Sequence, residues 1–172
     1  RRMQPEKDLF PARIKRRWMA DINAFTTDQV MATTDTEFGE MFVTEISRGC
    51  GRGCRFCAAG FVYRPVRYRT LDTLGPSLKK GLEQEKKIGL LGTAISDHPS
   101  LEAVCRTVLD RGGRLSLSSL RIDCITPQIA AIIREAGIDT IALAPEAGSE
   151  RLREVIRKDI TDQQIFEALE YL

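Results

Sequence analysis

Short apolar segments alternate with amphipathic segments through most of this chain. Four runs are predominantly apolar and predict β-strands, at residues 41–46, 88–96, 114–123 and 140–144. Between the strands, apolar residues recur at intervals of three and four, which is typical of helices with one buried face. We therefore expect a helix over about 73–87, others after Pro99 and Pro127, and two more from Ser149 and Thr161.

Capping signals place the ends of these helices. Glycines are expected to close three of them, at Gly89, Gly112 and Gly137. Thr126 precedes a proline as an N-cap would, and Thr161 with Gln164 has the spacing of a capping box. Strands that alternate with helices predict an α/β fold with a parallel sheet and right-handed crossovers. The turns that leave the carboxyl ends of the strands are where such folds place their chemistry.

Residues 1–37 show no clean period and predict an N-terminal extension, or a linker from an upstream domain, ahead of a core over 38–172. A basic cluster in it stands beside Trp18 and comprises Arg13, Lys15, Arg16 and Arg17. We interpret the cluster as a solvated arm whose Trp18 docks on a neighbouring domain, with an RNA-binding arm as the alternative.

Composition narrows the class of protein. The 172 residues, 42% hydrophobic and 29% charged, suit one globular domain, and a net charge of +2 is too small to argue for nucleic-acid binding. No apolar run approaches the roughly 18 residues of a membrane span, and no signal region opens the chain, so we expect no membrane association. A start without methionine suggests a piece of a longer chain. Three clustered cysteines among five argue for a reducing compartment, and we expect a cytoplasmic location.

Three cysteines stand in a glycine- and arginine-rich loop directly after the first predicted strand. Cys50, Cys54 and Cys57 have the spacing C-x3-C-x2-C, and the intervening glycines allow a tight turn in which the thiolates can converge. A structural zinc site needs four ligands, whereas His98 and Cys105 are about forty residues away or more. Three thiolates on an iron–sulfur cubane would leave one iron open for a substrate or cofactor.

With Phe56 just before the last cysteine, this loop resembles the signature of the radical S-adenosylmethionine (radical SAM) enzymes. Segments 45–50, 59–65 and 143–152 resemble the branch whose members carry an upstream cobalamin-binding domain. The resemblance runs from about Phe38 to the end and implies a partial (β/α) barrel, here truncated to about four of six β/α units. The fourth strand would then present an open edge, which predicts a homo-oligomer or a strand supplied by a partner.

The resemblance also implies the chemistry. Cys50, Cys54 and Cys57 would hold a [4Fe-4S] cluster whose open iron binds S-adenosylmethionine. Reductive cleavage would give a 5′-deoxyadenosyl radical for hydrogen abstraction or methyl transfer on an unknown substrate. It further implies an electron donor such as a flavodoxin or ferredoxin, and cobalamin through an upstream domain, although the truncated chain could itself be inactive.

Cofactor contacts follow from the resemblance at each strand end. Phe56 would lie against the adenine, with packing beneath the loop as the alternative. Gly92, Thr93 and Ala94 replace a Gly-Gly-Glu-like segment and would offer backbone contacts only. Ser118, Ser119 and Arg121 would reach the cofactor carboxylate or ribose, unless Arg121 is a surface charge. Glu146 would contact the amino or ribose groups, unless it caps the helix that follows.

The residues leave a second class of protein open. The cysteines could hold zinc in a nucleic-acid-binding module whose loop arginines contact phosphate: Arg48, Arg52, Arg55, Arg64, Arg67 and Arg69. In the enzyme, the same arginines would form an electropositive mouth or a solvated loop. We expect Cys105 and Cys124 to pack in the core and His98 to serve a turn.

Overall fold

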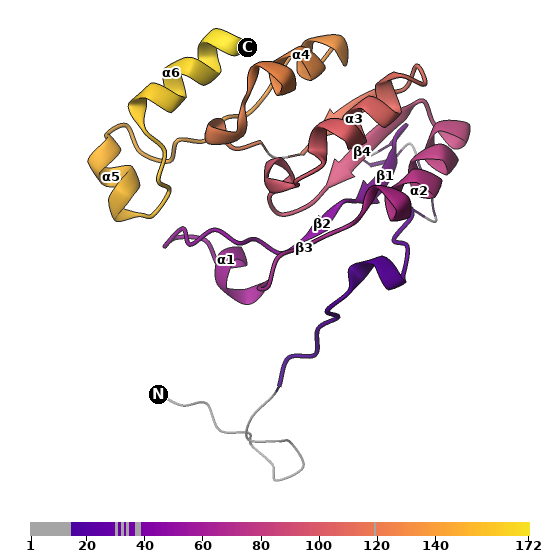
Figure 1. Ribbon diagram of the computed structural model, residues 1–172, viewed down its shortest axis with the longest axis horizontal. Helices are drawn as coiled ribbons and strands as arrows, with labels where there is room; N and C mark the ends of the chain where they lie inside the picture. Colours follow the sequence, from indigo (N-terminus) through magenta and orange to yellow (C-terminus); the bar gives the residue numbers. More distant parts are fainter. Residues whose placement is uncertain (1–14, 30, 32, 34, 37–38, 119) are drawn as a thin grey trace.

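The computed structural model describes residues 15–29, 31, 33, 35–36, 39–118 and 120–172 (Figure 1). At its centre lies a parallel sheet with the strand order β1 (Phe42–Glu45), β4 (Lys87–Leu91) and β5 (Arg114–Leu117). Phe42 lies beside Ile88, which lies beside Leu115, so the three carboxyl ends share one edge. The predicted α/β class is therefore confirmed.

Helices cover this sheet through their apolar faces. Helix α2 (Leu71–Gln84) packs on β1 and β4, α3 (Leu101–Leu109) packs on β5 and against α2, and α4 (Pro127–Glu135) packs against α3. The side chains between them include Phe42, Leu78, Ile88, Val104 and Ile132, each at most 2% exposed. Burial of these side chains at roughly 25 cal/mol per Å² of apolar surface drives the layers together.

The remaining elements lie beyond the carboxyl edge of the sheet. Two strands of two residues each, β2 (Ser47–Arg48) and β3 (Arg67–Tyr68), pair antiparallel and form the β2–β3 hairpin. The short helix α1 (Ala59–Val62) lies in the segment that connects them. Helices α5 (Glu150–Val155) and α6 (Asp162–Tyr171) lie at the opposite side of the molecule from α2 (Figure 1). Helix α6 contacts the 3₁₀ helix Ile122–Cys124. The paired strands β2 and β3 and helix α1 were not predicted, whereas α5 and α6 begin after Ser149 and Thr161 as expected.

The strand at 140–144 was predicted wrongly, and the sheet of the described residues has three strands rather than four. Exposure alternates along this segment, and Ile141 and Leu143 pack on the core, yet its backbone makes no ladder with β5. An alternating apolar run predicts which side chains turn inward, but not whether a neighbouring strand is available for hydrogen bonding. The parallel sheet and its helices are consistent with a partial β/α fold, while the described residues do not confirm a barrel.

The predicted ends of the other strands and helices are confirmed only in part. The runs at 88–96 and 114–123 begin as strands but end at Leu91 and Leu117, since a 3₁₀ helix follows each. Gly89 lies inside β4 instead of closing a helix, because α2 ends at Gln84. The predicted helix caps are confirmed. The Thr126 hydroxyl accepts from the Ile129 amide at 3.2 Å, and Thr161 and Gln164 form the expected capping box.

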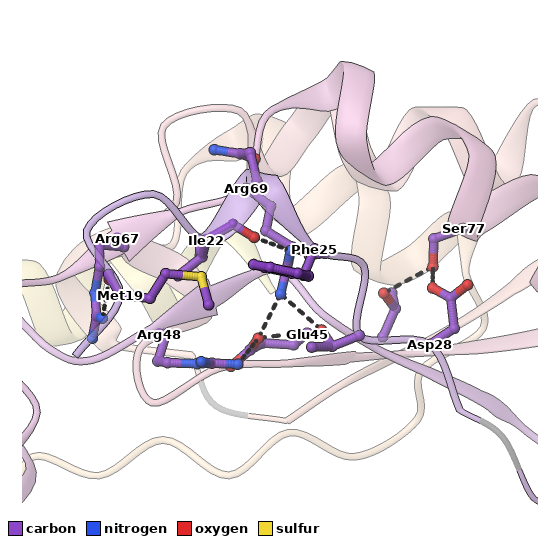
Figure 2. A network of polar contacts seen from close by, with 12 residues as sticks. Met19, Ile22, Phe25, Asp28, Glu45, Arg48, Arg67, Arg69 and Ser77 are labelled. Atoms are coloured by element: carbon purple, nitrogen blue, oxygen red, sulfur yellow. Dashed lines mark hydrogen bonds and ion pairs between the residues drawn. The ribbon is translucent and has the colours of Figure 1, made fainter. Parts of the chain in front are cut away.

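The described part of the N-terminal segment is anchored to the core (Figure 2). The buried guanidinium of Arg69 donates to the carbonyl oxygens of Ile22 and Phe25, both at 2.5 Å, and to Glu45 Oε2 at 3.0 Å. Burial acts to raise the pKa of Glu45, but hydrogen bonds from Arg48 and Arg69 hold it below its ordinary value. Residues 21–28 therefore pack with the sheet, while the boundary at residue 37 stays a prediction.

His98 occupies a buried turn before α3, as expected from its position. Its Nδ1 accepts from the Ser100 amide at 3.0 Å, so Nε2 carries the proton and donates to the Arg69 carbonyl at 2.9 Å. Burial lowers the pKa of His98 below 6.5, although the Arg69 bond opposes this. The fold thus holds a neutral imidazole.

A pH-dependent loss of stability follows, because this is the chain's single histidine. The unfolded state takes up a proton near pH 6.5 and the folded state only at lower pH, so stability is full above that value and declines as the pH falls. Urea unfolding across this range should show the decline, and an NMR titration of the imidazole should give a midpoint below 6.5. A midpoint at or above 6.5 would contradict the buried neutral ring.

Within the described part of the chain, no helix combines the length and apolar character needed to cross a membrane.

Candidate functional site

The cysteine loop leaves β2 at the carboxyl edge of the sheet. Cys50 and Cys54 are buried and Cys57 is half-buried. The Arg52 amide donates to Cys50 Sγ at 3.4 Å, and the Cys57 amide donates to the Cys54 carbonyl at 3.2 Å. Gly49 has φ +90°, and a Cβ there would overlap the Tyr63 carbonyl, so this position requires glycine.

The three thiols lie on one loop without converging on a point. Among the described residues, no three His, Cys, Asp or Glu side chains gather as ligands of a single ion. Ligation of a cluster by Cys50, Cys54 and Cys57 therefore stays a prediction, in which each thiolate would bind its own iron.

Arg52 fixes the loop to the two neighbouring strand ends. It binds both carboxylate oxygens of Asp97, with Nη2–Oδ1 at 2.6 Å and Nε–Oδ2 at 2.9 Å, and lies 3.4 Å from Asp123. Burial acts to raise the pKa of Asp97, but Arg52 lowers it below its usual value. Arg64 braces the same loop by donating to the Arg52 carbonyl at 2.8 Å. The position of the loop, which follows β1 and β2, thus depends on the bonds from Arg52 to Asp97 after β4 and to Asp123 after β5.

The other side of the loop meets the segment after α5. The Arg55 amide donates to the Ile156 carbonyl at 2.8 Å, and the Lys158 ammonium lies 5.9 Å from the centre of the Phe56 ring. Lys158 also pairs with Glu146 at 3.1 Å, and its carbonyl accepts from Arg121 at 3.0 Å. Lys158 therefore links three of the predicted cofactor residues, Phe56, Arg121 and Glu146.

For Arg121 and Glu146, the structure does not support the alternative roles of a surface charge and a helix cap. Arg121 is not a free surface charge, because it is half-buried and makes a two-point pair with Asp123 at 2.8 and 3.0 Å. Burial acts to lower the pKa of Arg121, but Asp123 raises it. Glu146 does not cap α5, since Ser149 accepts from the Leu152 amide. Glu146 instead has φ 70°, an uncommon conformation for a residue with a side chain.

Gly92 and Thr93 line a pocket of about 390 Å³ beside the cysteine loop. Ser47 and Gly49 line it as well, and the Ser47 hydroxyl is buried without a hydrogen-bond partner. A Cβ on Gly92 would collide with this hydroxyl, so the glycine keeps the pocket wall close to Ser47. The Ser47 oxygen is itself inaccessible, so the surface open to a ligand is formed by the other groups that line the pocket.

The remaining predicted residues lie elsewhere. Ala94 is buried, Ser118 lines a separate pocket of about 50 Å³ with Thr140 and Ile141, and Ser119 lies outside the described residues. Cys105 is in the core, where burial raises the pKa of its thiol to about 12. Cys124 lies beside the Arg52–Asp97 pair, with Sγ 3.6 Å from Asp97 Oδ1, rather than in the apolar core.

Sequence reasoning missed four residues that shape this site: Ser47, Asp97, Asp123 and Lys158. Asp97 directly follows the predicted strand at 88–96 and Asp123 ends the predicted strand at 114–123, and that shared position at a strand end is the signal that could have found them. Nothing in the local sequence marks Ser47 or Lys158, because each matters only through a distant partner.

The comparisons with known proteins decide the family. The model of the Radical SAM superfamily matches residues 44–172, which includes the cysteine loop, the pocket and the Lys158 segment. This chain belongs to the radical SAM superfamily.

An uncharacterized protein of Methanocaldococcus jannaschii, MJ0966, is 39% identical over 135 residues. The match covers 77% of this chain and 30% of that protein, so the chain spans less than a third of its relative's length. Members of the superfamily typically use a [4Fe-4S] cluster and S-adenosylmethionine, so a radical SAM type of function is supported for the domain.

Proposed function

We propose that this radical SAM domain binds a [4Fe-4S] cluster through Cys50, Cys54 and Cys57, and S-adenosylmethionine in the adjoining pocket. The observation that carries the proposal is the juxtaposition of the three-thiol loop and the pocket lined by Ser47, Gly92 and Thr93. Both lie at the carboxyl edge of the parallel sheet, inside the segment that matches the family.

The residues present fit the cluster and its cosubstrate. Thiolates are the usual protein ligands of such clusters, and a three-cysteine set leaves one position for a ligand. When bound and reduced, the cluster supplies the electron that cleaves the sulfonium bond of S-adenosylmethionine. The pocket offers the backbone of Gly92 and Thr93 to the polar groups of that molecule.

The chain's own residues then position the reacting groups. Arg52 holds the loop against Asp97 and Asp123, so the thiols stay at the strand ends. Phe56 is 54% exposed and is available to an adenine, while the Lys158–Glu146 pair lies next to its ring. Arg121 is already paired with Asp123, so binding the cofactor carboxylate would require that pair to open.

Finer aspects of the proposal rest on sequence resemblance and chemistry. Hydrogen abstraction and methyl transfer are both within the chemistry of the superfamily, and the likeness of segments 45–50 and 143–152 to the cobalamin-associated branch supports methyl transfer or rearrangement. A flavodoxin or ferredoxin in the cytoplasm would supply the electron. The edge of β5, which has no strand partner among the described residues, supports pairing with a second copy. Iron and zinc analysis of the purified protein distinguishes the cluster from the zinc alternative.

Anaerobic reconstitution with iron and sulfide tests the proposal. Electron paramagnetic resonance of the reduced protein should show a cluster signal, and S-adenosylmethionine should change that signal by binding the open iron. A protein that takes up tight zinc and no iron would overturn the assignment.

A further inference from the structure

A second pocket, of about 730 Å³, lies where the N-terminal segment crosses the β2–β3 hairpin. Its lining comes from three parts of the chain: Arg16, Arg17, Trp18 and Met19; Arg48 and Arg67 of the hairpin; and Tyr63 at the end of α1. Four arginines and two aromatic side chains therefore surround one space. The function proposed above uses none of Arg16, Arg17, Trp18 or Arg67.

Among the described residues, most of the positive charge of this pocket has no carboxylate partner. Arg16 donates to the carbonyl oxygens of Val62 and Arg64, and Arg67 donates to the Met19 carbonyl at 2.8 Å. Carbonyls are neutral acceptors, so these bonds fix the guanidinium groups without cancelling their charge. Within the described residues, Arg48 alone of the four has a carboxylate partner, Glu45, and Glu45 also serves Arg69.

The guanidinium groups also repel one another. Burial lowers the pKa of Arg67, and repulsion from Arg48 and Arg16 lowers it further. Positive charges held this close are stabilised when an anion binds between them. Arginine is suited to phosphate in particular, because its planar donors make two-point contacts with phosphate oxygens.

Trp18 adds a flat apolar surface to this cationic site. Its side chain is 51% exposed, Tyr63 is 55% exposed, and the Arg67 guanidinium lies 5.6 Å from the Trp18 ring centre. Aromatic rings beside arginines are the combination by which proteins stack a base and hold its phosphate. The pocket is also a neighbour of the candidate cofactor pocket, because Arg48 and Tyr63 line both.

We propose that this pocket binds a nucleotide, free or as a unit of a single strand, with its phosphate on Arg17, Arg48 and Arg67 and its base stacked on Trp18. A ligand so held would extend toward the cofactor pocket past Arg48 and Tyr63. The site is separate from the cysteine loop and binds without iron.

Trp18 reports on its own site, because it is the chain's single tryptophan. ADP, adenosine and a short oligoadenylate would be titrated into the iron-free 172-residue chain at low and high salt while Trp18 fluorescence is followed. ADP should quench the emission, adenosine should bind at least about tenfold more weakly, and added salt should weaken ADP binding. An oligoadenylate that binds much more tightly than ADP would identify the strand as the source, and equal binding would identify the free nucleotide.

Matched variants locate the phosphate. Arg17 makes no hydrogen bond to another described residue, so Arg17→Gln should keep the fold, checked by circular dichroism, and weaken ADP binding about tenfold. Lys79→Gln removes one exposed positive charge from α2, outside the pocket, and should leave binding unchanged. Unquenched emission at millimolar ADP, or equal losses in both variants, would overturn the proposal. Because no cluster is present, either result is independent of the iron–sulfur assignment.

Discussion

Replacing Cys54 by serine will abolish cluster binding. Cys54 is buried and is the middle cysteine of the three. A serine hydroxyl stays protonated at neutral pH and does not replace the thiolate that binds iron, so one iron of the cluster loses its protein ligand. After anaerobic reconstitution, the iron and sulfide content of Cys54→Ser should fall to background. The brown absorption of the wild-type protein should be absent.

A matched cysteine separates this effect from general damage. Cys105 is buried in the core away from the loop, and Cys105→Ala should lower stability through the cavity it leaves while keeping the full iron content. Cys124→Ser should also retain iron, because Cys124 lies with Asp97 rather than in the three-thiol loop. Iron retained in Cys54→Ser but lost in Cys124→Ser would show that the ligand set is different.

Replacing Arg69 by methionine will strongly destabilise the fold. The side chain is 3% exposed and holds Ile22 and Phe25 of the N-terminal segment against Glu45 of β1 (Figure 2). Its removal leaves two carbonyl oxygens and a half-buried carboxylate short of a partner. Breaking a buried charged network in this way costs about 3–5 kcal/mol, which urea unfolding followed by circular dichroism would measure.

The comparison variant for this prediction is Arg106→Gln. Arg106 pairs with Glu135 at the surface between α3 and α4, where solvent screens the interaction, so the unfolding midpoint should barely move. If Arg69→Met were as stable as Arg106→Gln, the N-terminal segment would not be anchored to the core as Figure 2 shows.

The features predicted best from the sequence were those encoded locally. Thr126 and Thr161 cap helices because a hydroxyl reaches an amide three residues along, and no distant residue is needed. The cysteine motif is likewise local, since its spacing and glycines fall within eight residues. The strand at 140–144 failed for the opposite reason: a strand requires a neighbour, and the neighbour is decided by the whole sheet.

The same distinction explains the site. Arg52 meets Asp97 and Asp123 across separations of 45 and 71 residues, and Arg69 meets Ile22 across 47. In the sequence the arginines around the cysteines form one basic run. The sequence does not distinguish a solvated loop from an electropositive mouth there. The structure separates these arginines: Arg52 and Arg69 hold the fold together, while Arg67, with Arg16 and Arg17 of the N-terminal basic cluster, leaves positive charge in a pocket beside Trp18.

Electron paramagnetic resonance of the reconstituted, reduced chain with and without S-adenosylmethionine tests the cluster and the cofactor pocket together. We expect a [4Fe-4S] signal that shifts when S-adenosylmethionine is added and that is absent in Cys54→Ser. A cluster signal indifferent to S-adenosylmethionine would contradict the pocket assignment. A colourless protein holding zinc would contradict the cluster itself.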